Sequence, residues 1–222
     1  MLSTSRIISI LVSVALVMFA AMIHEVAHGW VAYKCGDNTA KNAGRLTLNP
    51  MAHLDPFGSV ILPLVMALMG GAIFAYAKPV PYNPNNLRNR RRDELLVALA
   101  GPCSNLLQAL VAAAIFRAVW PLYASDPSTF LYWVCYVLSS YIYVNLILMF
   151  FNLIPLPPLD GSSIIGVFLT GHALETYYKV QRYSLPILLL LLYIVPTVFG
   201  IDPLGIYLNA TAGNLYDILL GA

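Results

Sequence analysis

Three long apolar stretches, more than any other feature, limit what this chain can fold into. They cover residues 7–33, 95–119 and 130–154, and the last of them carries no charged residue. About 20 helical residues, each rising ~1.5 Å, cross a hydrocarbon layer of ~30 Å. Each stretch is therefore long enough to span a bilayer as a helix. The sequence predicts an all-α polytopic membrane protein.

The composition excludes most other classes of protein. Of the 222 residues, 59% are apolar and 10% are charged, whereas an average soluble domain has about 25% charged residues. So apolar a chain is neither an ordinary soluble enzyme nor a disordered segment. Its net charge of +2 indicates no nucleic-acid partner. The three cysteines lack C-x-x-C spacing, so we expect neither a disulfide framework nor a thiolate metal site.

The remaining apolar segments are shorter or interrupted. Residues 60–77 contain a proline and a Gly-Gly pair, so we expect them to enter the membrane and return. Residues 185–199 are marginal for a span, and we expect 204–220 at the interface or only partly inserted. In all we expect about four to six transmembrane or re-entrant segments. They form one domain, 1–222, with extra C-terminal helices over about 183–222.

A different pattern follows the first long stretch. Residues 36–59 alternate turn-forming Gly, Asn, Asp and Pro with short apolar pieces. Such alternation is typical of short strands joined by tight turns. We therefore expect a strand at Gly44–Leu48, within a small membrane-associated β-hairpin or sheet.

The positions of the basic residues predict the orientation. Four arginines lie between positions 88 and 92, just before the second long stretch. Because Lys and Arg concentrate in cytoplasmic loops, this loop is expected in the cytoplasm. If 60–77 re-enters, only Arg6 and Arg117 lie outside, and ten of the twelve Lys and Arg residues lie inside. We expect a multi-pass protein of the plasma or inner membrane.

The first long stretch contains the sequence His24-Glu25-Val26-Ala27-His28 near its inner end. Residues i and i+4 share a helix face, so both imidazoles can reach one metal ion. Glu25 lies on the adjacent flank, where it can take a proton from a water molecule on that ion. The alternative is a pair of core histidines with a glutamate satisfied by its neighbours. Three ionisable groups so close together in a spanning helix are costly unless they pair or bind something, which favours the metal site. The site is expected toward the cytoplasmic side of the membrane.

A third protein ligand is needed if the metal is zinc. Asp160 closes the segment Asn152-Leu-Ile-Pro-Leu-Pro-Pro-Leu-Asp160-Gly161, after the uncharged stretch. Its three prolines cannot continue a helix, so the chain must unwind and is free to turn a carboxylate inward. An interfacial turn at the end of a helix explains Asp160 equally well. The local chemistry leaves both interpretations open.

Together, HEVAH and the later N-x-x-P-x-x-P-L-D-G segment resemble the site-2 protease family, peptidase family M50, of intramembrane zinc metalloproteases. The intervening LNPMAHLDPFGS and AGPCSN segments are also similar to that family's pattern. The resemblance covers roughly residues 15–170, within a catalytic core of about 7–170. It implies a minimal form without a PDZ or CBS domain.

The resemblance also implies roles for particular residues. One Zn²⁺ ion would be bound by His24, His28 and Asp160, and Glu25 would be the general base. Asn152 matches a family asparagine that helps to bind the substrate or to stabilise the oxyanion.

Further residues are expected to meet the substrate or water. The resemblance implies that Leu46, Thr47 and Leu48 belong to a sheet edge that holds an unwound substrate segment; a purely structural hairpin is the alternative. We expect His53 to form turns or hydrogen bonds near the site, and not to bind the metal. We also expect Asn105 to line the route by which water and substrate reach the site.

The expected function is cleavage of single-pass membrane proteins within or near their transmembrane segments. The expected partners are that substrate and the lipid bilayer, and homo-oligomerisation is left open. A membrane metal transporter is one alternative, but it would place ionisable groups on several helices, and 130–154 has none. An inactive relative is another alternative, which the presence of Glu25 disfavours.

Overall fold

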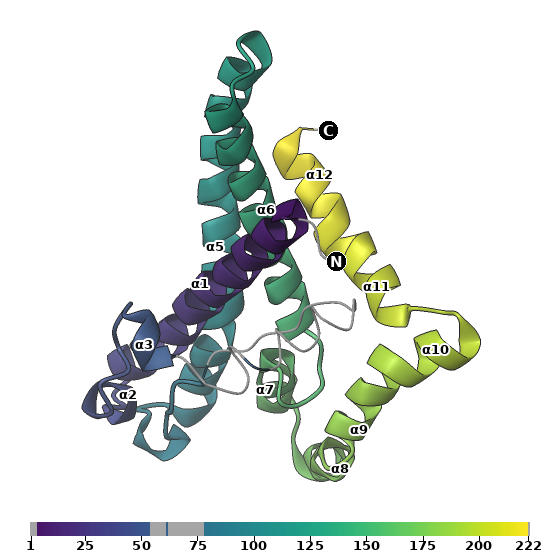
Figure 1. The fold of residues 1–222 in the computed structure, drawn as a ribbon. Helices are drawn as coiled ribbons and strands as arrows, with labels where there is room; N and C mark the ends of the chain where they lie inside the picture. The colour runs from purple at the N-terminus through teal and green to yellow at the C-terminus, as the bar shows by residue number, and fades with distance from the viewer. Residues whose placement is uncertain (1–3, 54–60, 62–77, 222) are drawn as a thin grey trace.

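The computed structural model describes residues 4–53, 61 and 78–221, and these are overwhelmingly helical (Figure 1). Three helices dominate: α1 (Thr4–Lys34), α5 (Arg90–Ser125) and α6 (Thr129–Asn152). The shorter elements are α2 (Thr39–Asn42), α3 (Pro50–His53), the 3₁₀ turn η2 (Pro84–Asn86), α7 (Asp160–Phe168), α8 (Gly171–Gln181), α9 (Ser184–Leu189), the π-helical turn η3 (Leu190–Ile194), α10 (Val195–Phe199), α11 (Pro203–Leu208), the π-helical turn η4 (Asn209–Gly213) and α12 (Asn214–Leu220).

The three long helices are each long and apolar enough to cross a membrane, over Ile7–Lys34, Arg90–Ser125 and Thr129–Asn152. They coincide with the three predicted spans, and the protein is a multi-pass integral membrane protein. α8 and Pro186–Phe199 would form a fourth crossing only as a pair bent by 58°. The predicted re-entry of 60–77 concerns residues that, except for Ile61, lie outside the described part of the chain.

α5 and α6 form an antiparallel pair that α1 crosses obliquely (Figure 1). The core of the pair is built from small residues of α5, such as Ala109 and Ala112, against Ile142 and Leu146 of α6. Small side chains let two helices approach closely, which is how helices gain packing energy where lipid removes the hydrophobic driving force. This pairing sets a rigid frame for the end of α1 that carries HEVAH.

The C-terminal helices return along this frame. α11, η4 and α12 run beside α6 in Figure 1, and Ala212 of η4 is fully buried in the α5–α6 core. Arg117 of α5 donates to the backbone carbonyls of Ile218 and Leu219, at 2.7 and 2.8 Å. A cation at a helix C-terminus satisfies carbonyls that have no partner within the helix. The contact therefore anchors the end of α12.

The predicted strand at Gly44–Leu48 is wrong, because the described residues contain no strand there or elsewhere. The backbone N–H of Arg45 donates to the carbonyl of Ala40, at the end of α2. The carbonyl of Thr47 accepts a bond from Nε2 of His53, at 2.8 Å. Backbone groups that a sheet would use are thus taken by local bonds, and the residues that suggested hairpin turns begin and end short helices instead.

The loop before α5 is attached to the end of α1 by a buried carboxylate. Asp37 is fully buried and accepts hydrogen bonds from the Thr39 N–H and hydroxyl, the Asn83 N–H and the Asn86 amide. Burial alone would raise the pKa of Asp37, but these bonds outweigh it and lower the pKa below its usual value. The loop that leads into α5 is therefore held against α1.

Candidate metal centre

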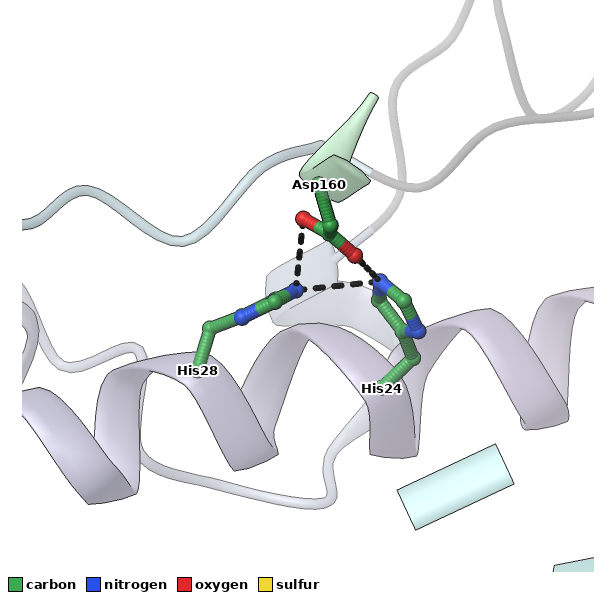
Figure 2. Close-up of side chains that lie close together, drawn as sticks. All are labelled: His24, His28 and Asp160. Atoms are coloured by element: carbon green, nitrogen blue, oxygen red, sulfur yellow. Dashed lines mark hydrogen bonds and ion pairs between the residues drawn. The ribbon is translucent and has the colours of Figure 1, made fainter. Parts of the chain in front are cut away.

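The HEVAH motif lies on the face of α1 that meets α5 and α7. His24 and His28 are one helical turn apart and are only 6% and 8% exposed. Their Nε2 atoms lie 3.0 Å apart and point into the same space (Figure 2). The i, i+4 spacing has therefore placed both imidazoles at one point, as a shared metal ion requires.

Asp160 completes this group from the other end of the sequence. Its Oδ2 lies 3.1 Å from Nε2 of His24, and its Oδ1 lies 3.2 Å from Nε2 of His28 (Figure 2). Asp160 is the first residue of α7, after the non-helical segment 153–159. That turn closes only with glycine at position 161, where a Cβ would lie 2.3 Å from the carbonyl oxygen of Leu153.

The three side chains fit a zinc ion. Zinc–ligand bonds of about 2.0–2.1 Å at tetrahedral angles imply ligand atoms about 3.3 Å apart. The two Nε2 atoms lie 3.0 Å apart, and they lie 3.1 and 3.2 Å from different oxygens of Asp160. One ligand atom from each of the three side chains lies within 4.8 Å of the other two. Oδ2 of Asp160 is buried and has no hydrogen bond within the described part of the chain, and a buried carboxylate oxygen needs a cation or a donor. Two imidazoles and one carboxylate match the ligand set of a catalytic zinc site with an open fourth position.

Both imidazoles are oriented by groups of α5. Nδ1 of His28 lies 2.6 Å from the backbone carbonyl of Val97, and Nδ1 of His24 lies 2.5 Å from Oδ1 of Asn105. An oxygen acceptor requires a proton on Nδ1, which leaves the Nε2 lone pair for a metal. Asn105, which was predicted to line the access route, is completely buried beside His24.

Gly101 makes this close approach of α5 possible. A Cβ at position 101 would lie 2.4 Å from Nε2 of His28 and from Cε1 of His24. The backbone of α5 therefore forms one wall of the site, and no larger residue fits there. Gly101 lies in the AGPCSN segment, but the sequence alone does not indicate this role.

Glu25 lies beside the three candidate ligands, outside the group that they form. Its Oε2 accepts a hydrogen bond from the backbone N–H of Val80, at 2.8 Å. Residues 78–80 are held in place by Arg45, which donates to the carbonyl of Lys78 at 2.6 Å. The segment thus fixes one carboxylate oxygen of Glu25. This contact cannot be predicted from the sequence, because a backbone N–H is present at almost every residue.

The other predicted site residues are more scattered. Asn152 donates from its side chain to the carbonyl of Leu148 in the last turn of α6. Leu46 packs against α1, where its Cδ2 would lie 2.9 Å from a Cβ at Gly29. Leu48 is 60% exposed. The structure does not bring these residues into contact with the three candidate ligands, so their roles in binding substrate stay predictions.

His53 bonds to the carbonyl of Thr47, is 3% exposed, and has no partner for Nδ1 among the residues that the structure describes. The backbone carbonyl of His53 accepts from the N–H of Lys78. Thr47 and His53 therefore help to hold the segment 78–80, in which the Val80 N–H bonds to Glu25.

Comparison with known proteins gives consistent matches. The sequence model described as Peptidase family M50 matches residues 12–128 and 123–195. YwhC of Bacillus subtilis, named as a candidate zinc metalloprotease, is 37% identical over 185 residues, which are 83% of this chain and 78% of YwhC. Rip2 of Mycolicibacterium smegmatis, with the same designation, is 27% identical over 79% of this chain and 64% of Rip2. No solved structure matches the chain.

Proposed function

Since the chain belongs to peptidase family M50 and is a zinc metalloprotease of the site-2 type, we propose that it hydrolyses peptide bonds within or near the transmembrane segments of single-pass membrane proteins. The observation that carries this proposal is the group formed by His24 and His28, on a helix long and apolar enough to span a membrane, and Asp160 of α7, with their metal-binding atoms within 4.8 Å of one another. A water-soluble substrate would not need such a site.

The side chains of His24, His28 and Asp160 would hold the zinc ion through Nε2, Nε2 and a carboxylate oxygen. Zinc, when bound, supplies the Lewis acidity that activates a water molecule at neutral pH. The negative charge of Asp160, with that of Glu25, offsets the charge of the ion. This offset lowers the cost of placing the group in a region of low dielectric constant.

Glu25 would act as the general base. Its position next to His24 in the helix puts its carboxylate on the flank of the metal site, and the Val80 N–H holds Oε2. The other oxygen can then take a proton from the attacking water and later deliver it to the leaving amine. Because the carboxylate of Glu25 is already held in place, it loses less conformational entropy when it reaches the position for proton transfer.

The active site would lie toward the cytoplasm. The N–H of Arg88 donates to the carbonyl of Cys35, so the arginine-rich loop lies at the C-terminal end of α1. His28 is six residues before Lys34, the end of α1, or about 9 Å along the axis. Positively charged loops face the cytoplasm, which supports release of a soluble cytoplasmic fragment.

The substrate would have to unwind near the site, because a helix shields its peptide bonds with its own hydrogen bonds. We propose that Leu46, Thr47 and Leu48, which follow α2, and Asn152, at the end of α6, contact the unwound segment. The support for Leu48 is its exposed apolar side chain, and for Leu46 its position against α1 next to the metal-binding turn.

The test compares wild type with Glu25→Gln in detergent and in vesicles, against a panel of single-span substrates. Zinc content is measured on the same samples. The amide cannot accept the proton, so we expect full zinc occupancy and loss of cleavage. Wild-type turnover by Glu25→Gln would refute the role of Glu25, and a zinc-free wild-type protein would refute the metal site.

A further inference from the structure

A chain of buried amides runs from the metal site into α6. Oδ1 of Asn105, on α5, faces Nδ1 of His24, and Nδ2 of Asn105 donates to Oδ1 of Asn145, on α6, at 3.0 Å. Nδ2 of Asn145 donates to the backbone carbonyl of Tyr141 at 2.9 Å. Both asparagine side chains are 0% exposed. Two fully buried amides in membrane helices are costly unless every polar atom is used.

The direction of every bond in this chain follows from its far end. A backbone carbonyl can only accept, so the Asn145 group that faces Tyr141 must be the NH₂. The oxygen of Asn145 then faces Asn105, and this forces the NH₂ of Asn105 to point toward α6. The oxygen of Asn105 is left to face His24, whose Nδ1 must therefore carry the proton.

We propose that Asn105 and Asn145 are positioning residues that fix the tautomer of His24 and hold its Nε2 lone pair toward the zinc ion. The inference rests on the proposed function, since it takes His24 to be a metal ligand. His28 needs no such chain, because the carbonyl of Val97 faces its Nδ1 directly. A backbone carbonyl thus determines the tautomer of each imidazole. The Val97 carbonyl acts directly on His28, and the Tyr141 carbonyl acts on His24 through the side chains of Asn145 and Asn105.

A simpler role for the amides is adhesion between α5 and α6, since interhelical hydrogen bonds stabilise membrane helices. The same helix pair provides a control for this role. The hydroxyl of Tyr141 donates to Oε1 of Gln108, which links α6 to α5 without touching His24. The Tyr141 hydroxyl also contacts the side chain of Asn145, so the control replaces its other partner. Gln108→Leu removes the Tyr141–Gln108 bond and leaves Tyr141, Asn105 and Asn145 in place.

The experiment measures zinc affinity by competition with a chelator in purified, substrate-free protein, for wild type, Asn105→Leu, Asn145→Leu and Gln108→Leu. Loss of a partner behind a metal-bound histidine typically weakens metal affinity 10–100-fold. We expect about this loss in Asn105→Leu. We expect a smaller loss in Asn145→Leu, where Asn105 remains but its amide is free to turn, and none in Gln108→Leu. The visible spectrum of the cobalt-substituted protein should change only in the two asparagine variants.

Wild-type zinc affinity and an unchanged cobalt spectrum in Asn105→Leu would overturn the inference. An equal loss in Gln108→Leu would also overturn it, because helix adhesion would then explain the effect. If Asn105→Leu does not fold, as judged by thermal unfolding, Asn145→Leu decides by the same two measurements. A wild-type protein without zinc would instead refute the proposed function, so the two failures are distinguishable.

Discussion

Substitution of Gly101 by alanine should disrupt the metal site while leaving the fold intact. The added Cβ would lie 2.4 Å from Nε2 of His28, whereas ordinary contacts begin at 3.4 Å. The imidazoles or the backbone of α5 must therefore move apart by about 1 Å, the difference between these two distances. A misplacement of ~1 Å in a catalytic group can lower the rate about 100-fold.

We expect Gly101→Ala to weaken zinc affinity about 10–100-fold and to lower cleavage about 100-fold at saturating zinc. Gly166→Ala, in α7, is the matched control, because a Cβ there meets nothing within 4 Å. Alanine stabilises a helix by about 0.5–1 kcal/mol relative to glycine, so neither variant should unfold through loss of helix propensity. Chelator competition, cleavage and thermal unfolding are measured together. Wild-type affinity and cleavage in Gly101→Ala would refute the close packing of α5 on the histidines.

Two further substitutions test separate parts of the account. Asp160→Ala should lower zinc affinity by at least ~100-fold, since loss of a residue that only hydrogen-bonds to a ligand already costs up to that much. Glu175→Ala, which removes an exposed carboxylate of α8, should leave zinc affinity unchanged. Zinc affinity is measured by chelator competition, and tight zinc binding by Asp160→Ala would exclude Asp160 as a ligand. Asp37→Asn should lower the free energy of unfolding by about 1–3 kcal/mol, because the NH₂ of the new asparagine would face the Asn83 N–H. The pKa of Asp37 is lower in the folded chain than in the unfolded chain. The stabilisation that the Asp37 carboxylate gives the fold is therefore complete above the unfolded-state pKa, and it is lost as the pH falls through the folded-state pKa. Thermal unfolding at decreasing pH should show this loss in wild type and not in Asp37→Asn, and identical pH profiles would contradict it.

The sequence predicts the spanning helices and the metal-binding turn because each depends on local information. Apolar length alone defines a span, and the i, i+4 spacing of His24 and His28 fixes their shared face. The position of Asp160 beside them depends on tertiary structure. Its local sequence therefore suited both a ligand and an interfacial turn, until the non-helical segment before α7 placed it at 3.1 and 3.2 Å from the histidines.

The strand at Gly44–Leu48 was wrong because the same residue types form hairpin turns and helix ends. Gly44 follows the end of α2 with a φ of +66°, a left-handed conformation that glycine adopts more readily than other residues. Gly101 and Val80 were missed for another reason. Gly101 acts through the side chain that it lacks and Val80 through its backbone N–H, and neither feature produces a pattern in one sequence.

The most direct test of the central claim is X-ray absorption spectroscopy at the zinc edge of the purified, membrane-extracted protein. The account predicts one zinc ion with two imidazole nitrogens at about 2.0–2.1 Å and oxygen ligands from a carboxylate and water. The imidazole signal should be lost when His24 and His28 are both replaced by alanine. Purified protein that holds no zinc, or a zinc spectrum unchanged by that double substitution, would contradict the claim.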